Sequence, residues 1–243
     1  MTSPTSAPTV VLVHGAFADA SSWAGVIDRS RRAGVAAVAP SNPLRSLTAD
    51  GEYIAGVVSQ IEGPVLLVGH SYGGPVITYA SSKADNVRGL VFVASFGLDK
   101  GMSTLGSNAE FAPAELDSSL LPRTFPTGDG TGTEFYIRPD LFQSVFCADL
   151  PPEQAATMAA SQRPATDTAF GEPLAVEPGW KRVPSWFVIA GSDHAINPDA
   201  ERAAAQRIGA TATVIEGGSH AIALSRADEV TEVILSAVQT VAK

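Results

Sequence analysis

The stretch of sequence that decides the fold is Val65-Leu66-Leu67-Val68-Gly69-His70-Ser71-Tyr72-Gly73-Gly74. Its first four residues form an apolar run typical of a buried strand, and the chain then breaks into a turn around Ser71. Glycines two residues before and two residues after the serine suit a sharp strand-to-helix turn, because the strained backbone brings those positions too close to neighbouring chain for a Cβ atom. Residues 75–80 then predict a helix, since a proline at position 75 is tolerated in a first turn. The stretch therefore predicts a turn that holds the Ser71 hydroxyl out above the sheet.

Composition and charge narrow the class of protein. The 243 residues are 45% hydrophobic and 17% charged, which suits one α/β domain with a sizeable core. The formal net charge is -9 and Lys and Arg form no cluster, so we expect no nucleic-acid partner and no membrane partner. The single cysteine, Cys147, excludes an intramolecular disulfide and a cysteine-based metal site. Residues 1–9 lack the pattern of a signal peptide and no apolar run reaches membrane-spanning length, so we expect a cytoplasmic protein with a short frayed start.

Apolar runs alternate with helical patterns along most of the chain. The predicted strands are 10–13, 35–39, 65–68, 90–94, 185–190 and 211–215, and the predicted helices are 23–32, 47–61, 75–80, 197–208 and 225–241. This alternation predicts an α/β fold with a mainly parallel six-stranded sheet flanked by helices. His14, Ser71, Asp193 and His220 each follow a predicted strand. Because ligands bind at the carboxyl ends of such strands, we expect these four residues to face one crevice.

The alternation stops after the fourth predicted strand. Residues 97–180 contain many prolines and glycines, no strong strand pattern and scattered bulky apolar residues. A structureless loop of this length is uncommon in a compact domain, so we predict several short helices packed as a lid over the strand ends. The expected organisation is a core formed by 1–96 and 181–243, with a helical lid, 97–180, inserted after the fourth strand.

A serine hydroxyl needs a base within hydrogen-bond reach, and a carboxylate must hold that base in the right tautomer. Of the four histidines, His70 neighbours Ser71 in a tight turn and is expected to point away from it. His14 is expected to shape the first glycine loop, and His194 to lie at the edge of the site. His220 follows the last strand in a glycine-rich loop and is the predicted base.

The predicted acid is Asp193, which follows the fifth strand 27 residues before His220. Asp99 and Glu216 are the alternatives. The tetrahedral intermediate also needs preorganised N–H donors. The expected donors are the main-chain amides of Tyr72 and Ala16, with Phe17 as the second choice for the latter.

Together these residues resemble the α/β-hydrolase superfamily over almost the whole chain outside the lid. The motifs are His14-Gly15-Ala16, Gly69-His70-Ser71-Tyr72-Gly73-Gly74, Gly191-Ser192-Asp193 and Gly217-Gly218-Ser219-His220. They look like the branch that contains small carboxylesterases, plant methyl esterases and hydroxynitrile lyases. The resemblance implies the α/β-hydrolase fold and cofactor-free ester hydrolysis, with acylation of Ser71, His220 as base and lid residues around the substrate. Lyases of this branch carry threonine where Gly15 stands and lysine where Ala221 stands, which argues against that activity.

We therefore expect a serine carboxylesterase for small to medium, apolar or aromatic esters, with neither cofactor nor metal, acting as a monomer or homodimer on a small-molecule ester. The residues expected to bind substrate are Phe17, His14, Phe96, Phe125 and Phe142. The alternatives are a small-molecule receptor with vestigial hydrolase activity, or a lyase, perhydrolase or cofactor-free oxygenase on the same fold.

Overall fold

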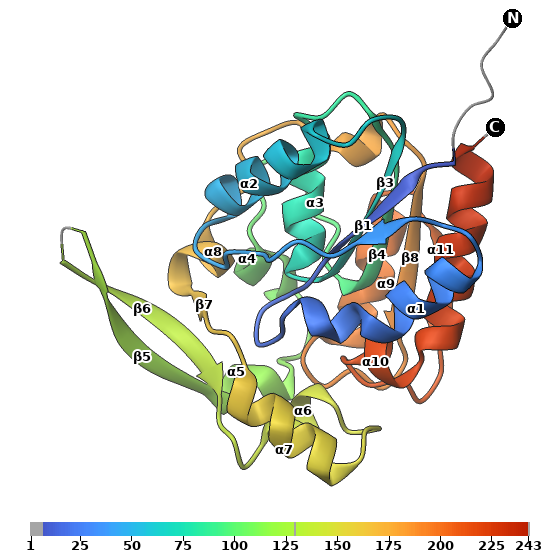
Figure 1. The fold of residues 1–243 in the computed structure, drawn as a ribbon. Helices are drawn as coiled ribbons and strands as arrows, with labels where there is room; N and C mark the ends of the chain where they lie inside the picture. Colours follow the sequence, from blue (N-terminus) through green and yellow to red (C-terminus); the bar gives the residue numbers. More distant parts are fainter. Residues whose placement is uncertain (1–6, 129, 243) are drawn as a thin grey trace, which may run out of the picture.

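The computed structural model describes residues 7–128 and 130–242, and its centre is one parallel sheet (Figure 1). The strand order is β2-β1-β3-β4-β8-β9, and every neighbouring pair is parallel. The strands are β1 (Thr9–Val13), β2 (Ala37–Val38), β3 (Val65–Ser71), β4 (Val87–Ser95), β8 (Ser185–Ala190) and β9 (Thr211–Ile215). The predicted six-stranded parallel sheet is thus confirmed, with β2 shorter than expected. The frayed start was predicted for 1–9; residues 1–6 lie outside the described residues, and β1 already begins at Thr9.

Helices cover both faces of the sheet, which explains why its strands read as continuous apolar runs. Alternate residues of β1 enter opposite halves of the core: Val11 and Val13 pack on one face, and Val10 and Leu12 on the other. The helices on the first face are α2 (Leu47–Ser59), α3 (Gly73–Ser81) and α9 (Pro198–Arg207). Those on the second face are α1 (Ala24–Arg32), α10 (Ile222–Ser225) and α11 (Ala227–Val241), with the short 3-10 helix η1 (Ala20–Trp23) before α1. In the described part of the chain, no helix is both long and apolar enough to cross a bilayer.

The segment between β4 and β8 is not only helical, which corrects the prediction for 97–180. Its helices are α4 (Thr104–Asn108), α5 (Glu115–Ser119), α6 (Phe142–Phe146), α7 (Pro152–Ser161), α8 (Asp167–Gly171) and the 3-10 helix η2 (Gly179–Lys181). A second, antiparallel sheet accompanies them, formed by β5 (Leu120–Thr127), β6 (Gly130–Ile137) and β7 (Ala165–Thr166). The hairpin of β5 and β6 projects away from the central sheet (Figure 1). The sequence analysis missed β5 because prolines stand at positions 122 and 126. The structure accepts them because β5 is an edge strand, which lacks a partner on one side.

Main-chain hydrogen bonds tie this inserted segment to the core at separate places. The Thr166 N–H donates to Leu44 O, and the Phe17 N–H donates to Arg163 O. The helix α2 is also held, because the Thr48 hydroxyl donates to the Glu172 carboxylate at 2.6 Å. The inserted segment is therefore packed on the core as a fixed part of the fold.

Candidate active site

Ser71 lies in a strained turn at the carboxyl end of β3. Its φ is +52°, a left-handed conformation that is costly for a residue with a side chain. The flanking glycines allow the turn, because a Cβ on Gly69 would lie 2.5 Å from Gly73 O and a Cβ on Gly73 would collide with Val13 O. The Ser95 hydroxyl donates to the carbonyl of Ser71 at 2.5 Å and holds the turn from the neighbouring strand. The glycines thus allow the sharp turn that their spacing predicted, with Ser71 buried as the last residue of β3.

A buried acid and base lie together at the ends of β8 and β9. Nδ1 of His220 is 2.6 Å from Oδ2 of Asp193, and both side chains are almost fully buried. The other oxygen, Oδ1, accepts from the N–H groups of Ala195 at 2.6 Å and Ile196 at 2.8 Å. Since Oδ2 accepts, Nδ1 carries the ring proton and Nε2 is left with a free lone pair. No hydrogen bond joins His220 to Ser71 in the described residues, a contact that in ligand-free sites often tightens only with substrate.

His70 holds the loop that carries His220. Its Nε2–H donates to the main-chain carbonyl of His220 at 2.8 Å, and the two ring centres are 4.7 Å apart. Burial, together with the neighbouring His220 ring, holds the pKa of His70 well below its usual value. The lowered pKa makes this ring a weaker base than an ordinary imidazole, and its Nε2 is already occupied by the loop of His220.

The other two histidines are also occupied elsewhere. The Nδ1–H of His14 donates to Gly15 O, and its Nε2 accepts from the Asn42 N–H, each at 2.9 Å. Burial lowers the pKa of His14 to about 4, so the ring is neutral at pH 7. His194 is partly exposed and donates from Nδ1 to Ser144 O at 2.9 Å.

The two alternative acids lie away from His220. Asp99 forms an ion pair with Lys181 at 2.7 Å, and that ion pair lowers the pKa of its carboxyl group. Glu216 is exposed in the loop after β9. Of the three carboxylates considered from the sequence, Asp193 is the one that contacts the His220 ring.

Two main-chain N–H groups beside Ser71 are unused. In the described residues, no hydrogen bond occupies the N–H of Ala16, in the loop after β1, or of Tyr72, which follows Ser71. The N–H of Phe17 donates to Arg163 O at 2.8 Å and is therefore not available as the second choice. Ala16 lines the same cavity as Ser71 and Tyr72 follows Ser71 in the chain, so these two amides stay the predicted donors to a developing oxyanion.

A narrow, mainly apolar cavity of about 50 Å³ opens beside the serine. Its lining residues are Ala16, Phe17, Ser71, Phe96, Thr104, Leu105, Asn108, Leu116, Leu120, Phe170, Ala195, Ile196 and His220. The inserted segment supplies one wall, because the residues from 104 to 120 and Phe170 belong to it. No charged side chain is among these residues, so the cavity suits a neutral ligand. Within residues 7–128 and 130–242, no group of three or more His, Cys, Asp or Glu side chains is placed to hold a metal ion.

The predicted substrate-binding residues divide into two sets. Phe17 and Phe96 line the cavity, whereas His14, Phe125 and Phe142 do not, which corrects their assignment. His14 is fully buried behind its loop, and Phe142 is fully buried in the core. Phe125 lies on the projecting hairpin, where the Arg45 guanidinium is 4.9 Å from its ring centre. Residue type alone could not separate these rings, because aromatic side chains serve core and pocket equally well.

Sequence reasoning missed the residues that hold the loop of His220. The Phe146 carbonyl accepts from the Ala221 N–H at 3.0 Å, and the Phe146 ring centre is 4.9 Å from that of His220. Asp149 accepts from the hydroxyl of Ser219 at 2.5 Å. Both Phe146 and Asp149 belong to the inserted segment, and no local signal links them to a loop more than 60 residues further along the chain.

Sequence reasoning also missed Glu201, a fully buried carboxyl group next to the acid. Its Oε2 accepts from the Ala190 N–H at 3.2 Å, and its carboxyl group contacts that of Asp193. Burial first, and then the charge of Asp193, raise the pKa of Glu201 well above its usual value. Both causes favour the uncharged form of the Glu201 carboxyl group beside Asp193.

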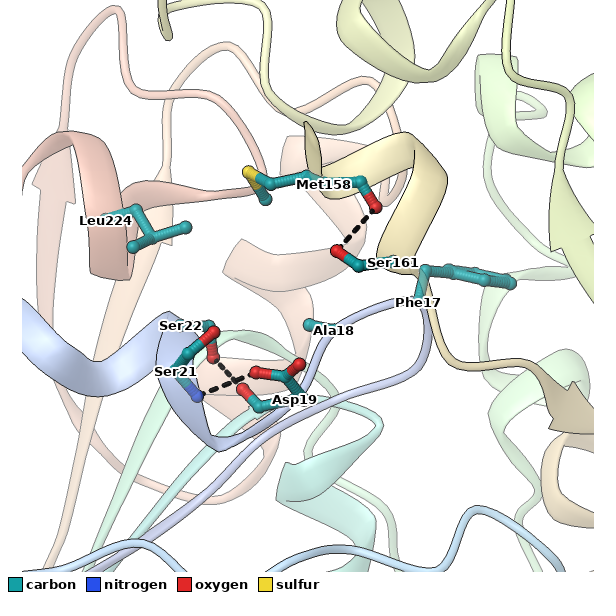
Figure 2. A pocket seen from close by; sticks show the side chains of 8 residues that line it. All are labelled: Phe17, Ala18, Asp19, Ser21, Ser22, Met158, Ser161 and Leu224. Atoms are coloured by element: carbon teal, nitrogen blue, oxygen red, sulfur yellow. Dashed lines mark hydrogen bonds between the residues drawn. The ribbon is translucent and has the colours of Figure 1, made fainter. Parts of the chain in front are cut away.

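A second cavity of about 40 Å³ lies beside the loop after β1 (Figure 2). Its polar groups are bonded to one another: the Asp19 side chain accepts from the Ser21 N–H at 2.7 Å, and the Ser22 hydroxyl donates to Asp19 O at 2.7 Å. Figure 2 shows the Phe17 ring pointing away from Asp19 and Ser21. This cavity contains neither Ser71 nor His220, so the cavity beside the serine is the candidate active site.

Comparisons with known proteins agree with this fold. The family model described as "Alpha/beta hydrolase family" matches residues 10–233. Polyneuridine aldehyde esterase superposes with a TM-score of 0.83 at 20% identity, covering 95% of this chain and 99% of that one. A pyrethroid hydrolase from Sphingobium faniae JZ-2 gives 0.75 at 18% identity, with 96% and 97% covered, and the Arabidopsis methylesterase MES16 gives 0.74 at 19%, with 96% and 99% covered. No curated protein sequence matches significantly. At these identities the solved structures show the fold alone, whereas the family model spans most of the chain: the protein belongs to the alpha/beta hydrolase family.

Proposed function

We propose that this hydrolase is a serine carboxylesterase that cleaves small, neutral, largely apolar carboxylic esters through an acyl-enzyme on Ser71. The observation that carries the proposal is the buried contact between His220 Nδ1 and Asp193, with His220 and Ser71 lining one cavity. That contact leaves Nε2 as the basic nitrogen of the ring. The esterase names of structural neighbours support the same reaction class.

The proposed reaction has two halves. In the first, His220 Nε2 takes the proton of the Ser71 hydroxyl as Oγ bonds to the ester carbonyl carbon, and the carbonyl oxygen becomes an oxyanion facing the N–H groups of Ala16 and Tyr72. The intermediate collapses, the bond to the alcohol oxygen breaks, and His220 returns the proton to that leaving oxygen. In the second half, water attacks the acyl-enzyme with His220 as base, which releases the carboxylic acid and restores Ser71. Asp193 holds the His220 tautomer throughout and stabilises the imidazolium.

The size and chemistry of the cavity narrow the proposed substrate. A volume of about 50 Å³ is a few times what a single water molecule needs, so short acyl or alkoxy groups fit better than long chains. Phe17, Phe96 and Phe170 supply an apolar wall, and without a facing charge an ionised substrate would lose its hydration. We propose short, uncharged esters, which is narrower than the class expected from sequence.

The close packing of Gly15 against Ser71 argues against a lyase. A Cβ at Gly15 would lie 2.6 Å from the Ser71 Cβ, so the threonine found there in related lyases would require this loop to move. No particular contact favours the receptor, perhydrolase or oxygenase alternatives, and one kinetic experiment separates them from an esterase.

That experiment is a pre-steady-state burst with p-nitrophenyl acetate and butyrate on the native protein and on Ser71→Ala. An esterase gives a burst that is stoichiometric with protein, absent in Ser71→Ala, and followed by steady turnover that is faster for acetate. A single burst with negligible turnover would favour the receptor, and no burst in the native protein would contradict the proposal.

A further inference from the structure

Helix α4 presents two unpaired polar atoms at the wall of the active-site cavity. Thr104 Oγ1 and Asn108 Oδ1 are both buried, and neither has a hydrogen-bond partner within the described residues. Both residues line the cavity. Four positions apart on a helix, the two residues lie on the same face, so their side chains are neighbours. Apart from Ser71 and His220, the remaining lining side chains are apolar.

Unpaired polar atoms of this kind are unusual, because a buried donor or acceptor without a partner destabilises the fold. On other helices of this protein, Thr78 donates to Gly74 O at 2.8 Å and Thr231 donates to Ala227 O at 2.6 Å, whereas the Ser30 hydroxyl of α1 is also unpaired in the described part of the chain but does not line the cavity. Thr104 is the first residue of α4 and has no preceding turn of helix whose carbonyl could accept. Its hydroxyl is therefore free for a molecule in the cavity.

We infer that Thr104 and Asn108 form a polar subsite that recognises a hydroxyl group on the substrate, an inference that rests on the proposed ester hydrolysis. The two atoms need complementary partners: Asn108 Oδ1 accepts, and the Thr104 hydroxyl can donate. A neutral hydroxyl group satisfies both, since it donates one hydrogen bond and accepts another. A ketone or ether oxygen cannot donate to Asn108, and a carboxylate also brings a charge that nothing in the cavity balances. The preferred substrates are thus short hydroxy esters.

The first test measures binding without turnover, using Ser71→Ala so that the ester remains intact. The ligands are ethyl 3-hydroxybutyrate, as each enantiomer, and ethyl butyrate, which lacks only the hydroxyl group. We expect one enantiomer to bind roughly five- to tenfold more tightly than ethyl butyrate in calorimetric or NMR titrations, the size of a neutral hydrogen bond. Adding Thr104→Val, which replaces the hydroxyl by a methyl group of similar size, should reduce that ratio to about one.

Three further variants test whether the preference depends on the hydroxyl group. Thr104→Ser restores the hydroxyl and should restore the preference, whereas Asn108→Leu should remove it. Leu105→Ala, which lines the cavity from the same helix without a polar group, should weaken both esters alike and keep their ratio. Equal binding of both esters by Ser71→Ala, or a preference that survives in both Thr104→Val and Asn108→Leu, would overturn the inference.

Hydrolysis by the protein with Ser71 intact is measured separately with the same two esters in a pH-stat. A preference in binding without any hydrolysis would contradict the proposed esterase function and support the polar subsite. Rapid hydrolysis of both esters without a preference in binding would support the esterase function and contradict the subsite.

Discussion

Replacing Asp193 by asparagine should nearly abolish turnover and leave the fold in place. Oδ1 of Asp193 accepts from two main-chain N–H groups, those of Ala195 at 2.6 Å and Ile196 at 2.8 Å, and Oδ2 accepts from His220 Nδ1 at 2.6 Å. An asparagine keeps its oxygen at the Oδ1 position, because an NH₂ group there would face two donors. Its NH₂ group must then take the place of Oδ2 and face the His220 ring.

This orientation reverses the tautomer of His220. Nδ1 becomes an acceptor, so the ring proton moves to Nε2, the nitrogen that should take the proton of Ser71. The same change in serine-protease triads lowers kcat by about 10⁴-fold, or about 5.4 kcal/mol of activation free energy. We expect a loss of that order here, since the contact is short, buried and supported on both carboxylate oxygens. KM should change little, because Asp193 does not line the cavity.

The assay is the acylation rate in a burst experiment with p-nitrophenyl acetate. Asp99→Asn and Glu216→Gln are matched controls that remove the same charge from exposed positions, and both should remain within about twofold of the native rate. Circular dichroism and the melting temperature establish that each variant folds. Near-native acylation by Asp193→Asn, together with a large loss in either control, would refute the assignment of the acid.

Three further predictions address the surroundings of the site. Gly15→Ala should lower kcat about 100-fold and also cost stability, because its Cβ would lie 2.6 Å from the Ser71 Cβ and 2.8 Å from the main-chain His70 O; an unchanged burst rate would contradict this. The pKa of His14 is about 4 when folded and about 6.5 when unfolded, so its contribution to the free energy of unfolding is complete above pH 6.5 and falls by about 3 kcal/mol towards pH 4. Urea unfolding from pH 7 to 4 should therefore show a steeper loss for the native protein than for His14→Gln, and parallel curves would contradict it. Glu201→Gln should keep kcat within about threefold, because burial and the charge of Asp193 raise the pKa of Glu201 and so favour the uncharged form, which glutamine resembles; a displaced pH profile of kcat/KM would contradict this.

The sequence predicted the central sheet well because its signals are local. Runs such as Val10–Val13 are apolar at every position, which is what a strand covered on both faces requires. The topology also predicted where the site lies, because residues that follow parallel strands meet at one edge of the sheet. Asp193 and His220 are in contact there. Their catalytic roles, and that of Ser71, remain predictions for the kinetic experiments.

The inserted segment was poorly predicted because long-range contacts determine its structure. The strand β5 contains two prolines and pairs with a glycine- and threonine-rich partner, so neither alternation nor composition marks it. Phe125 and Phe142 have the same residue type as Phe96 but occupy different environments. Asp149 and Glu201 are ordinary acidic residues in sequence, and only the folded chain shows that one bonds the loop of the base and the other contacts the acid.

These contacts also change how the inserted segment is understood. It was expected to be a lid, yet its α6 carbonyl at Phe146 accepts from Ala221 directly after the base, and its Leu116 N–H donates to His194 O directly after the acid. A lid that opened as one body would break both bonds and displace the groups that must stay aligned for catalysis. Substrate entry therefore requires a smaller movement. Leu105 of α4 is 58% exposed and also lines the cavity, so the cavity meets solvent beside α4, a helix that makes neither of these two hydrogen bonds.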